Sequence, residues 1–206
     1  MRNSPAEAGN DMLKSLGMLV EDLREKARVS YNSEDLPALA KVLTTDGTLA
    51  MVLYRLMQGS RELGLGPLEM VFNKLNSAFG GAVIGRGADF GPGFVIFHSN
   101  GVVINGKVKG GAHVHIEHEV TIGDDGFGHF PELGSDIYVG AGAKIIGGVK
   151  VGDGARVGAN AVVVHDAPAR STVVGIPARP VKRRSDSNGT DRGAASVSAT
   201  PSDPSG

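Results

Sequence analysis

An apolar residue recurs at every sixth position from residue 84 to residue 163, with a single interruption. The positions are Ile84, Phe90, Ile96, Val102, Val108, Val114 and Val120, followed by Val139, Ile145, Val151, Val157 and Val163. Neither the 3.6-residue period of a helix nor the two-residue period of a strand produces such a pattern. A sixfold repeat is typical of a parallel β-helix, in which each unit forms one short face and stacked units bury a shared apolar column. Three faces make a coil of about 18 residues, so the twelve positions predict about four coils.

The repeat is interrupted at Gly123–Asp136, GDDGFGHFPELGSD, and resumes one residue out of phase. Gly, Asp and Pro favour loops, so the chain is predicted to leave the β-helix here and return to it. Loops carried on a rigid scaffold are frequent sites of function. We therefore expect a β-helix domain over residues 80–182 with a projecting loop at 123–136.

The residues before the repeat have helical periodicity. Apolar side chains spaced three and four apart, beginning at Leu13, alternate with charged residues and predict an α-helical domain over residues 11–79. Thr45-Asp46-Gly47 marks a break between two of its helices. The two ends differ from this pattern, because residues 1–10 are polar and residues 183–206 are rich in Ser, Asp, Gly and Pro without periodicity. Both ends are predicted to be disordered.

Composition excludes several kinds of partner and site. The net charge of -1 provides no basic footprint for nucleic acid. The chain has no cysteine, so it can form neither disulfides nor a cysteine metal site. No apolar run approaches the roughly 18 residues of a spanning helix, and the N-terminus lacks the pattern of a signal peptide. The sequence therefore predicts a soluble, cytoplasmic protein without a membrane span.

One histidine stands out within the repeat. The stretch FVIFHSNGVVINGK, residues 94–107, places His98 two positions after Ile96, at an expected corner between two faces. Imidazole has an ordinary pKa near 6.5, so a neutral base is available at physiological pH. The residue pattern alone leaves two interpretations open: a catalytic base on a rigid scaffold, or a polar residue at the edge of the core.

The stretch from Ile137 to Arg183 resembles the C-terminal coils of hexapeptide-repeat acyltransferases, and the chain as a whole resembles the serine acetyltransferase family. The segments that extend the match are Tyr54-Arg55-Leu56, Ile84-Gly85-Arg86-Gly87, Gly101-Val102-Val103-Ile104 and Val120-Thr121-Ile122-Gly123. The resemblance covers most of residues 15–183. It implies a mainly β fold, namely a left-handed parallel β-helix preceded by an N-terminal α-helical domain. It also implies a homotrimer or a dimer of trimers, with active sites between subunits and acetyl-CoA as co-substrate.

The resemblance assigns His98 the role of general base on an acceptor hydroxyl. It implies direct transfer of acetyl from the thioester to that hydroxyl, with no covalent intermediate on the enzyme. A group that orients the histidine is then expected nearby. With about 18 residues per coil, Glu117 lies close to His98 on the next coil and is the first candidate, ahead of Asp89 or a backbone carbonyl.

Several positions depart from the family pattern. An aspartate usually precedes the catalytic histidine and a second lies fifteen residues upstream, but here these positions are Phe97 and Val83. A position that is acidic in the family is occupied here by Gly106, and the family's loop motif Arg-His-Pro is replaced by His129-Phe130-Pro131. Most groups that would recognise serine are thus missing. We expect a sugar or another small hydroxyl metabolite as acceptor, as in polysaccharide O-acetylation, with L-serine, for cysteine biosynthesis, as the family default. The expected acceptor-binding residues are Phe97, His118 and His129.

The resemblance also points to residues for coenzyme A. Small residues on the C-terminal coils of the family let the pantetheine arm approach the backbone. The matching positions here are Gly123, Ala141, Gly142, Ala143 and Ala159. Lys144 and Arg156 are expected to pair with the phosphates of the coenzyme. Tight β-helix geometry is the alternative explanation for the small residues.

Two alternative functions remain open. His113, His115 and His118 suggest a hydratase of the β-helical carbonic anhydrase type, because that family also places two histidines five residues apart. Its third ligand would fall at Ser77, so no metal is expected. The other alternative is a non-catalytic β-helix scaffold. The last residues, Asp203-Pro204-Ser205-Gly206, lack the isoleucine with which many family members dock cysteine synthase, so that complex is not expected.

Overall fold

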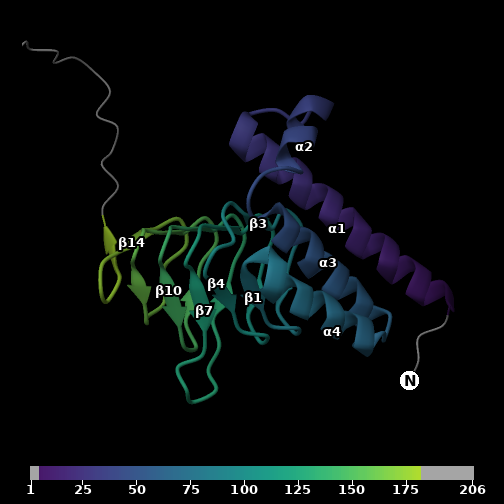
Figure 1. Cartoon of the computed structure of the whole chain (residues 1–206). Coiled ribbons are helices and arrows are strands. Elements are labelled where there is room, and N and C mark those ends of the chain that lie inside the picture. The colour runs from purple at the N-terminus through teal and green to yellow at the C-terminus, as the bar shows by residue number, and fades with distance from the viewer. Residues whose placement is uncertain (1–4, 182–206) are drawn as a thin grey trace, which may run out of the picture.

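The structure is a computed structural model that describes residues 5–181 of the chain. Its helices are α1 (Pro5–Tyr31), α2 (Leu36–Val42), α3 (Thr48–Glu62), α4 (Gly66–Leu75) and the π-helical turn η1 (Asn76–Gly80). The strands are β1 (Ala82–Ile84), β2 (Asp89–Phe90), β3 (Val95–Ile96), β4 (Val102–Ile104), β5 (Lys109–Gly110), β6 (His115–Ile116), β7 (Thr121–Gly123), β8 (Glu132–Leu133), β9 (Tyr138–Val139), β10 (Lys144–Ile146), β11 (Lys150–Val151), β12 (Arg156–Val157), β13 (Val162–Val163), β14 (Thr172–Val174) and β15 (Arg179–Val181). Figure 1 shows the helices gathered at one end of a β-solenoid.

Helix α1 begins earlier than the sequence predicts. It starts at Pro5, so more than half of the segment predicted to be disordered, residues 1–10, is helical. The first four residues and the predicted tail at 183–206 lie outside the described residues. None of the helices within residues 5–181 is long and apolar enough to cross a membrane.

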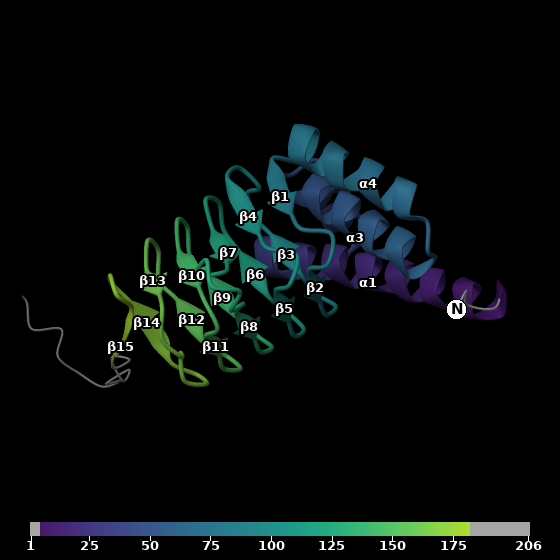
Figure 2. The same ribbon diagram turned by 90° about the horizontal axis from the view of Figure 1, so that it is seen from below.

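The strands form three parallel sheets that make the sides of a triangular prism. Sheet A has the order β1-β4-β7-β10-β13, sheet B the order β11-β8-β5-β2, and sheet C the order β15-β14-β12-β9-β6-β3, with β15 antiparallel to β14. Figure 2 shows these rows running along the prism, away from the helices. The predicted fold class, a parallel β-helix preceded by helices, is confirmed.

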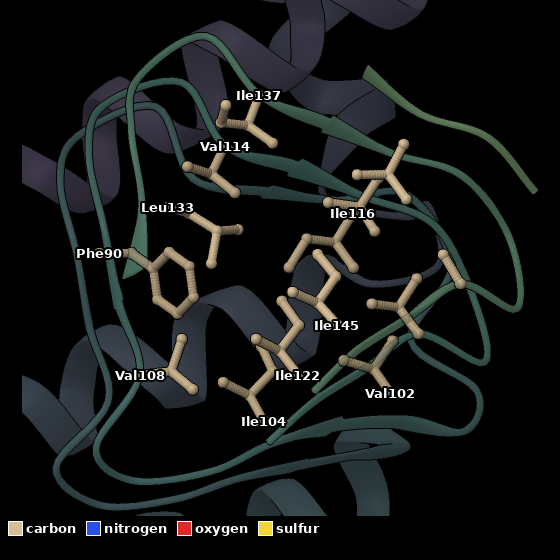
Figure 3. Close-up of a cluster of buried hydrophobic side chains, with 14 of the residues drawn as sticks. Phe90, Val102, Ile104, Val108, Val114, Ile116, Ile122, Leu133, Ile137 and Ile145 are labelled. Carbon is tan, nitrogen blue, oxygen red and sulfur yellow. The ribbon is translucent and has the colours of Figure 1, made fainter. Parts of the chain in front are cut away.

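The prism has about five turns, one more than the sixfold count predicts. The count missed three faces: Leu133 lies six residues before Val139 but within the segment predicted to be a loop, and Ala167 and Val173 fall out of phase. These three residues are buried, with 6%, 3% and 2% exposed. All twelve counted positions are buried, with at most 2% of each residue exposed. Their side chains meet inside the triangle, as Figure 3 shows for Phe90, Ile116 and Ile145 among others. Burying each Val, Ile or Phe contributes about 1.5–3 kcal/mol, so this column stabilises the prism.

The first coil is longer than 18 residues because its corner at His98 is enlarged. Ile96 pairs with Ile116, whereas Val103 pairs with Thr121. The first coil therefore takes seven residues to pass from Ile96 to Val103, whereas the next coil takes five to pass from Ile116 to Thr121. The two extra residues lie in the corner Phe97–Gly101, between sheet C and sheet A.

The projecting loop is shorter than predicted. Gly123 ends β7, and Glu132–Leu133 forms β8 between β5 and β11, so the excursion spans residues 124–131. Gly110 pairs with Leu133, an offset of 23, and Leu133 pairs with Val151, an offset of 18. The difference is five inserted residues, and because five is not a multiple of six the sixfold count does not resume in phase. The excursion leaves the prism next to β7 in Figure 1.

The helical domain covers the open end of the prism and satisfies its backbone. The first coil has no neighbouring coil on one side, so its polar groups would otherwise remain unpaired. Tyr54 donates to Ala88 O (3.2 Å) and accepts from Phe90 N (3.0 Å). Asn73 donates to Ile84 O (2.7 Å), and Lys26 donates to Ile96 O (2.9 Å). Helix side chains thus take the place of a preceding coil.

A buried ion pair lies at the centre of this contact. Arg55 and Asp22 form two hydrogen bonds, Nε to Oδ2 at 2.7 Å and Nη2 to Oδ1 at 3.0 Å, and both side chains are at most 1% exposed. Arg55 also donates to Phe90 O (2.8 Å) and Gly91 O (2.5 Å), while Asp22 accepts from Phe94 N (2.9 Å). The pair therefore joins α1, α3 and the first coil.

A second polar cluster joins α1 to sheet C around Glu25. Its carboxylate contacts His115 Nε2 at 2.9 Å, His113 Nδ1 at 3.4 Å and the guanidinium of Arg28. Burial opposes ionisation of Glu25, but Arg28 and the two histidines outweigh it and hold the pKa of the carboxyl below its ordinary value. Burial also lowers the pKa of His115, against the attraction of Glu25.

These shifts predict that acid destabilises the protein. At pH values below about 6.5 the unfolded chain protonates position 115 more readily than the folded chain does, and below about 4.3 the same holds for Glu25. Because the unfolded state then binds more protons, the free energy of unfolding falls with pH, by at most about 1.4 kcal/mol per pH unit for each group. Urea unfolding at pH 7.5, 6 and 5 measures the slope. His115→Gln is expected to make the slope shallower, and an unchanged slope would contradict this assignment.

Candidate active site

His98 lies in the enlarged corner between β3 and β4, with 57% of its side chain exposed. Its Nδ1 atom is 3.1 Å from Oδ2 of Asp46, a residue of the turn between α2 and α3. An imidazole nitrogen bonded to a carboxylate carries the proton, so the other nitrogen keeps its lone pair. His98 Nε2 is thereby free to accept a proton, as a general base must.

The carboxylate at His98 is therefore Asp46, and the prediction for Glu117 is corrected. Glu117 accepts a hydrogen bond from the Tyr138 hydroxyl at 3.2 Å instead. The reason is the longer corner, which advances the register by two residues on the next coil. His118, not Glu117, is the neighbour of His98, and the centroids of the two rings are 6.0 Å apart.

Two of the expected acceptor-binding residues lie at this corner. Phe97 is half-buried, and its ring stands edge-on to that of His115, with centroids 6.0 Å apart. His118 is also half-buried and lies 4.0 Å from Glu117. The corner thus presents one histidine base, a second imidazole and an apolar ring.

The third expected residue, His129, lies elsewhere on the prism. It sits in the excursion 124–131, at the corner between sheet A and sheet B, whereas His98 is at the corner between sheet C and sheet A. His129 Nδ1 is 2.8 Å from Asp125 Oδ2, and Asp125 also accepts from Phe127 N at 2.9 Å. The hydrogen bond from His129 lowers the pKa of Asp125. A single chain does not bring His98 and His129 to the same corner.

The expected coenzyme residues fall into two groups. Ala143 is fully buried, and the Cβ of an alanine at Gly142 would lie 2.1 Å from Asn160 Oδ1, so coil packing accounts for both small residues. Gly123 differs, because a Cβ there would meet nothing within 4 Å. Ala141 is half-buried and Ala159 is exposed. They lie on successive coils, at the same corner of the prism as His98, between sheet C and sheet A.

The two expected phosphate partners already have contacts within the chain. Lys144 on sheet A donates to the carbonyl of Glu119. Arg156 on sheet C stacks over the ring of Tyr138, with the guanidinium carbon 4.4 Å from the ring centroid. Each cation is thereby held at a fixed level of the prism.

The histidines that suggested a metal site have other roles in the structure. His113 and His115 contact Glu25, and the ring of His118 stands edge-on to that of His98. Across the part of the chain that the structure describes, no group of three or more His, Cys, Asp or Glu side chains is arranged to hold a metal ion.

Sequence reasoning missed Asp46. The Thr45-Asp46-Gly47 sequence predicts only a break between helices, and the contact with His98 spans 52 residues. Asp46 and His98 share no motif and no regular spacing, so the sequence does not link them.

Comparison with known proteins agrees with this fold. Residues 130–165 match the family described as bacterial transferase hexapeptide (six repeats). The serine acetyltransferase of Helicobacter pylori strain J99 is 38% identical over 147 residues, which are 69% of this chain and 85% of that protein. The serine acetyltransferase of Bacillus subtilis strain 168 is 35% identical over 143 residues, which are 68% of this chain and 66% of the relative.

Solved structures show the same architecture. The soybean serine acetyltransferase apoenzyme superposes with a TM-score of 0.74 at 32% identity, over 82% of this chain and 69% of that one. A serine acetyltransferase in complex with CoA gives a TM-score of 0.75 at 27% identity, over 85% of this chain and 73% of that one. From the repeat, the fold and these relatives, the chain belongs to the serine acetyltransferase family of acetyl-CoA-dependent acyltransferases.

Proposed function

We propose that the protein is an acetyl-CoA-dependent O-acetyltransferase in which His98 is the general base. The observation that carries this proposal is an exposed imidazole whose Nδ1 is held by a carboxylate at 3.1 Å, on a rigid corner of the prism. His98 Nε2 removes the proton from the acceptor hydroxyl while the hydroxyl oxygen attacks the thioester carbonyl. The tetrahedral intermediate then collapses, and the imidazolium returns that proton to the departing thiolate. One C–O bond forms, one C–S bond breaks, and His98 ends neutral.

The family relatives favour L-serine as the acceptor. Those compared above are named serine acetyltransferases, and none of them supports the sugar acceptor that the sequence departures suggested. The hydratase and the non-catalytic scaffold also find no support among them. We therefore propose serine O-acetylation, with Phe97 and His118 beside the base as contacts of the acceptor.

A thiol-release assay tests the acceptor directly. Purified protein is incubated with acetyl-CoA and either L-serine, D-serine, L-threonine or a panel of monosaccharides, and free CoA thiol is measured. Turnover with L-serine above all others is expected. A sugar that is turned over faster than serine would contradict the proposed acceptor, and no release with any hydroxyl compound would contradict the proposed function.

The separate corners of His98 and His129 support a site shared between copies of the chain. If His129 contacts the acceptor, it must come from a neighbouring subunit of a trimer. His98→Ala and His129→Ala subunits that are unfolded and reassembled together would then form some intact sites. Recovery of activity in the mixture, with little in either parent, tests this arrangement.

Gly123 provides a test of the coenzyme face. Gly123→Ala is expected to leave the melting temperature within about 1 °C of the wild type, because its Cβ would meet no atom within 4 Å. If the pantetheine arm lies against this strand, KM for acetyl-CoA rises by about tenfold or more, since a methyl group would occupy its path. Gly142→Ala is the matched control. Its φ of 71° and the contact with Asn160 predict a loss of about 1–2 kcal/mol of stability. An unchanged KM in Gly123→Ala would contradict the coenzyme assignment.

A further inference from the structure

We propose that Asp46, in the helical domain, is the positioning residue that orients His98 and fixes its tautomer. The inference rests on the proposed function of His98 as general base. It assigns the helical domain a part in the reaction beyond covering the end of the prism. The position where the family resemblance expects the orienting aspartate is Val83, whose apolar side chain is 50% exposed on β1.

The backbone of Asp46 is anchored by a buried lysine. Lys26 of α1 is 2% exposed, and its ammonium donates to the carbonyl of Asp46, to Thr48 Oγ1 at 3.0 Å and to Ile96 O at 2.9 Å. Ile96 is two residues before His98. One cation therefore joins the turn that carries the carboxylate to the strand that leads into the histidine corner.

The residue after Asp46 lets the turn lie directly on that strand. Gly47 has a φ of 74°, and a Cβ at this position would lie 2.2 Å from Ile96 O and 3.1 Å from Phe97 O. Only glycine permits so close an approach. Lys26 and Gly47 thus hold the Asp46 backbone by contacts that do not involve the Asp46 side chain.

That geometry leaves the carboxylate with one clear contact. The Asp46 side chain is 78% exposed, and among the described residues its side-chain partner is His98 Nδ1. The only other ring close to His98 in those residues is that of His118, at 6.0 Å between centroids. A carboxylate at Nδ1 selects the tautomer whose Nε2 can take the proton of the substrate hydroxyl. It also stabilises the imidazolium formed in that step.

Asp46→Asn is the first test, because it keeps the shape of the side chain and removes its charge. An asparagine amide can donate to Nδ1 and would favour the tautomer with the proton on Nε2. We expect kcat for thiol release to fall about ten- to a hundredfold, with KM for both substrates within about twofold. The loss is smaller than the roughly 10⁴-fold effect of a buried triad aspartate, because both side chains here are more than half exposed.

Two further variants separate positioning from general damage. Asp46→Glu is expected to recover at least part of the lost kcat, since it returns a carboxylate. Asp136→Asn is the charge-matched control on a different corner, and its kcat is expected to equal that of the wild type. Gly47→Val, which pushes the turn away from Ile96, is expected to lower kcat like Asp46→Asn while Asp46 itself is retained.

An NMR measurement distinguishes failure of this inference from failure of the proposed function. Long-range ¹H–¹⁵N spectra of protein labelled at histidine nitrogen, with His98→Gln to assign the signals, report the tautomer without any need for activity. The Nδ1–H form is expected in the wild type and its loss in Asp46→Asn. Normal kcat and an unchanged tautomer in Asp46→Asn would overturn the inference while leaving His98 as base. A wild type without acetyl transfer would overturn the proposed function, and the spectra would still decide whether Asp46 orients His98.

Discussion

Replacing His98 with alanine is expected to lower kcat for acetyl transfer by about two to four orders of magnitude, the usual contribution of general-base catalysis. The variant loses both the proton acceptor and the proton donor for the departing thiolate. Because the side chain is 57% exposed and outside the apolar column, its melting temperature should stay close to that of the wild type. KM for acetyl-CoA should change little, since the coenzyme is expected along the later coils.

His165→Ala is the matched control for this prediction. His165 is also an exposed histidine of the prism, but it lies beyond β13 at the corner between sheet A and sheet B. Thiol release with acetyl-CoA and serine measures both variants. Wild-type turnover in His98→Ala would remove the histidine from the reaction, and an equal loss in both variants would point to damage unrelated to position 98.

The prism could be predicted well because its core pattern depends only on residues close together in the sequence. Each six-residue face buries its own apolar residue, so the period is visible without knowledge of distant contacts. The count failed only where the chain departs from six. The enlarged corner at His98 and the five inserted residues near His129 changed the register, and the positions expected above His98 were displaced with it.

The site was less predictable for the same physical reason. His98 could be identified because it sits within the repeat, beside a motif of the family. Its partner Asp46 comes from a turn between helices, and their contact depends on how Lys26 and Gly47 seat that turn against β3. Neither feature has a sequence period. A coil of about 18 residues favours Glu117 instead, because it places that residue near His98.

The largest loss of stability is expected from Arg55→Met. The substitution leaves the Asp22 carboxylate fully buried, with Phe94 N as a remaining hydrogen-bond donor, and it removes the partner of Phe90 O and Gly91 O. Removing one member of a buried pair typically costs about 3–5 kcal/mol, since the remaining charge is uncompensated. Domains of this kind are stable by only about 5–15 kcal/mol, so the midpoint of urea unfolding should fall steeply.

Arg24→Met is the control, because it makes the same substitution in the same domain on an exposed pair. Arg24 and Glu21 are 3.2 Å apart with 51% and 55% of their side chains exposed, and such pairs contribute about 0–1 kcal/mol. The double variant Asp22→Asn/Arg55→Met is expected to be more stable than Arg55→Met alone, since it removes the stranded charge. It should remain less stable than the wild type, because two carbonyls of the first coil still lack a donor. If the free energies of unfolding of Arg55→Met and Arg24→Met differ by less than about 1 kcal/mol, the ion pair does not hold the helical domain on the prism.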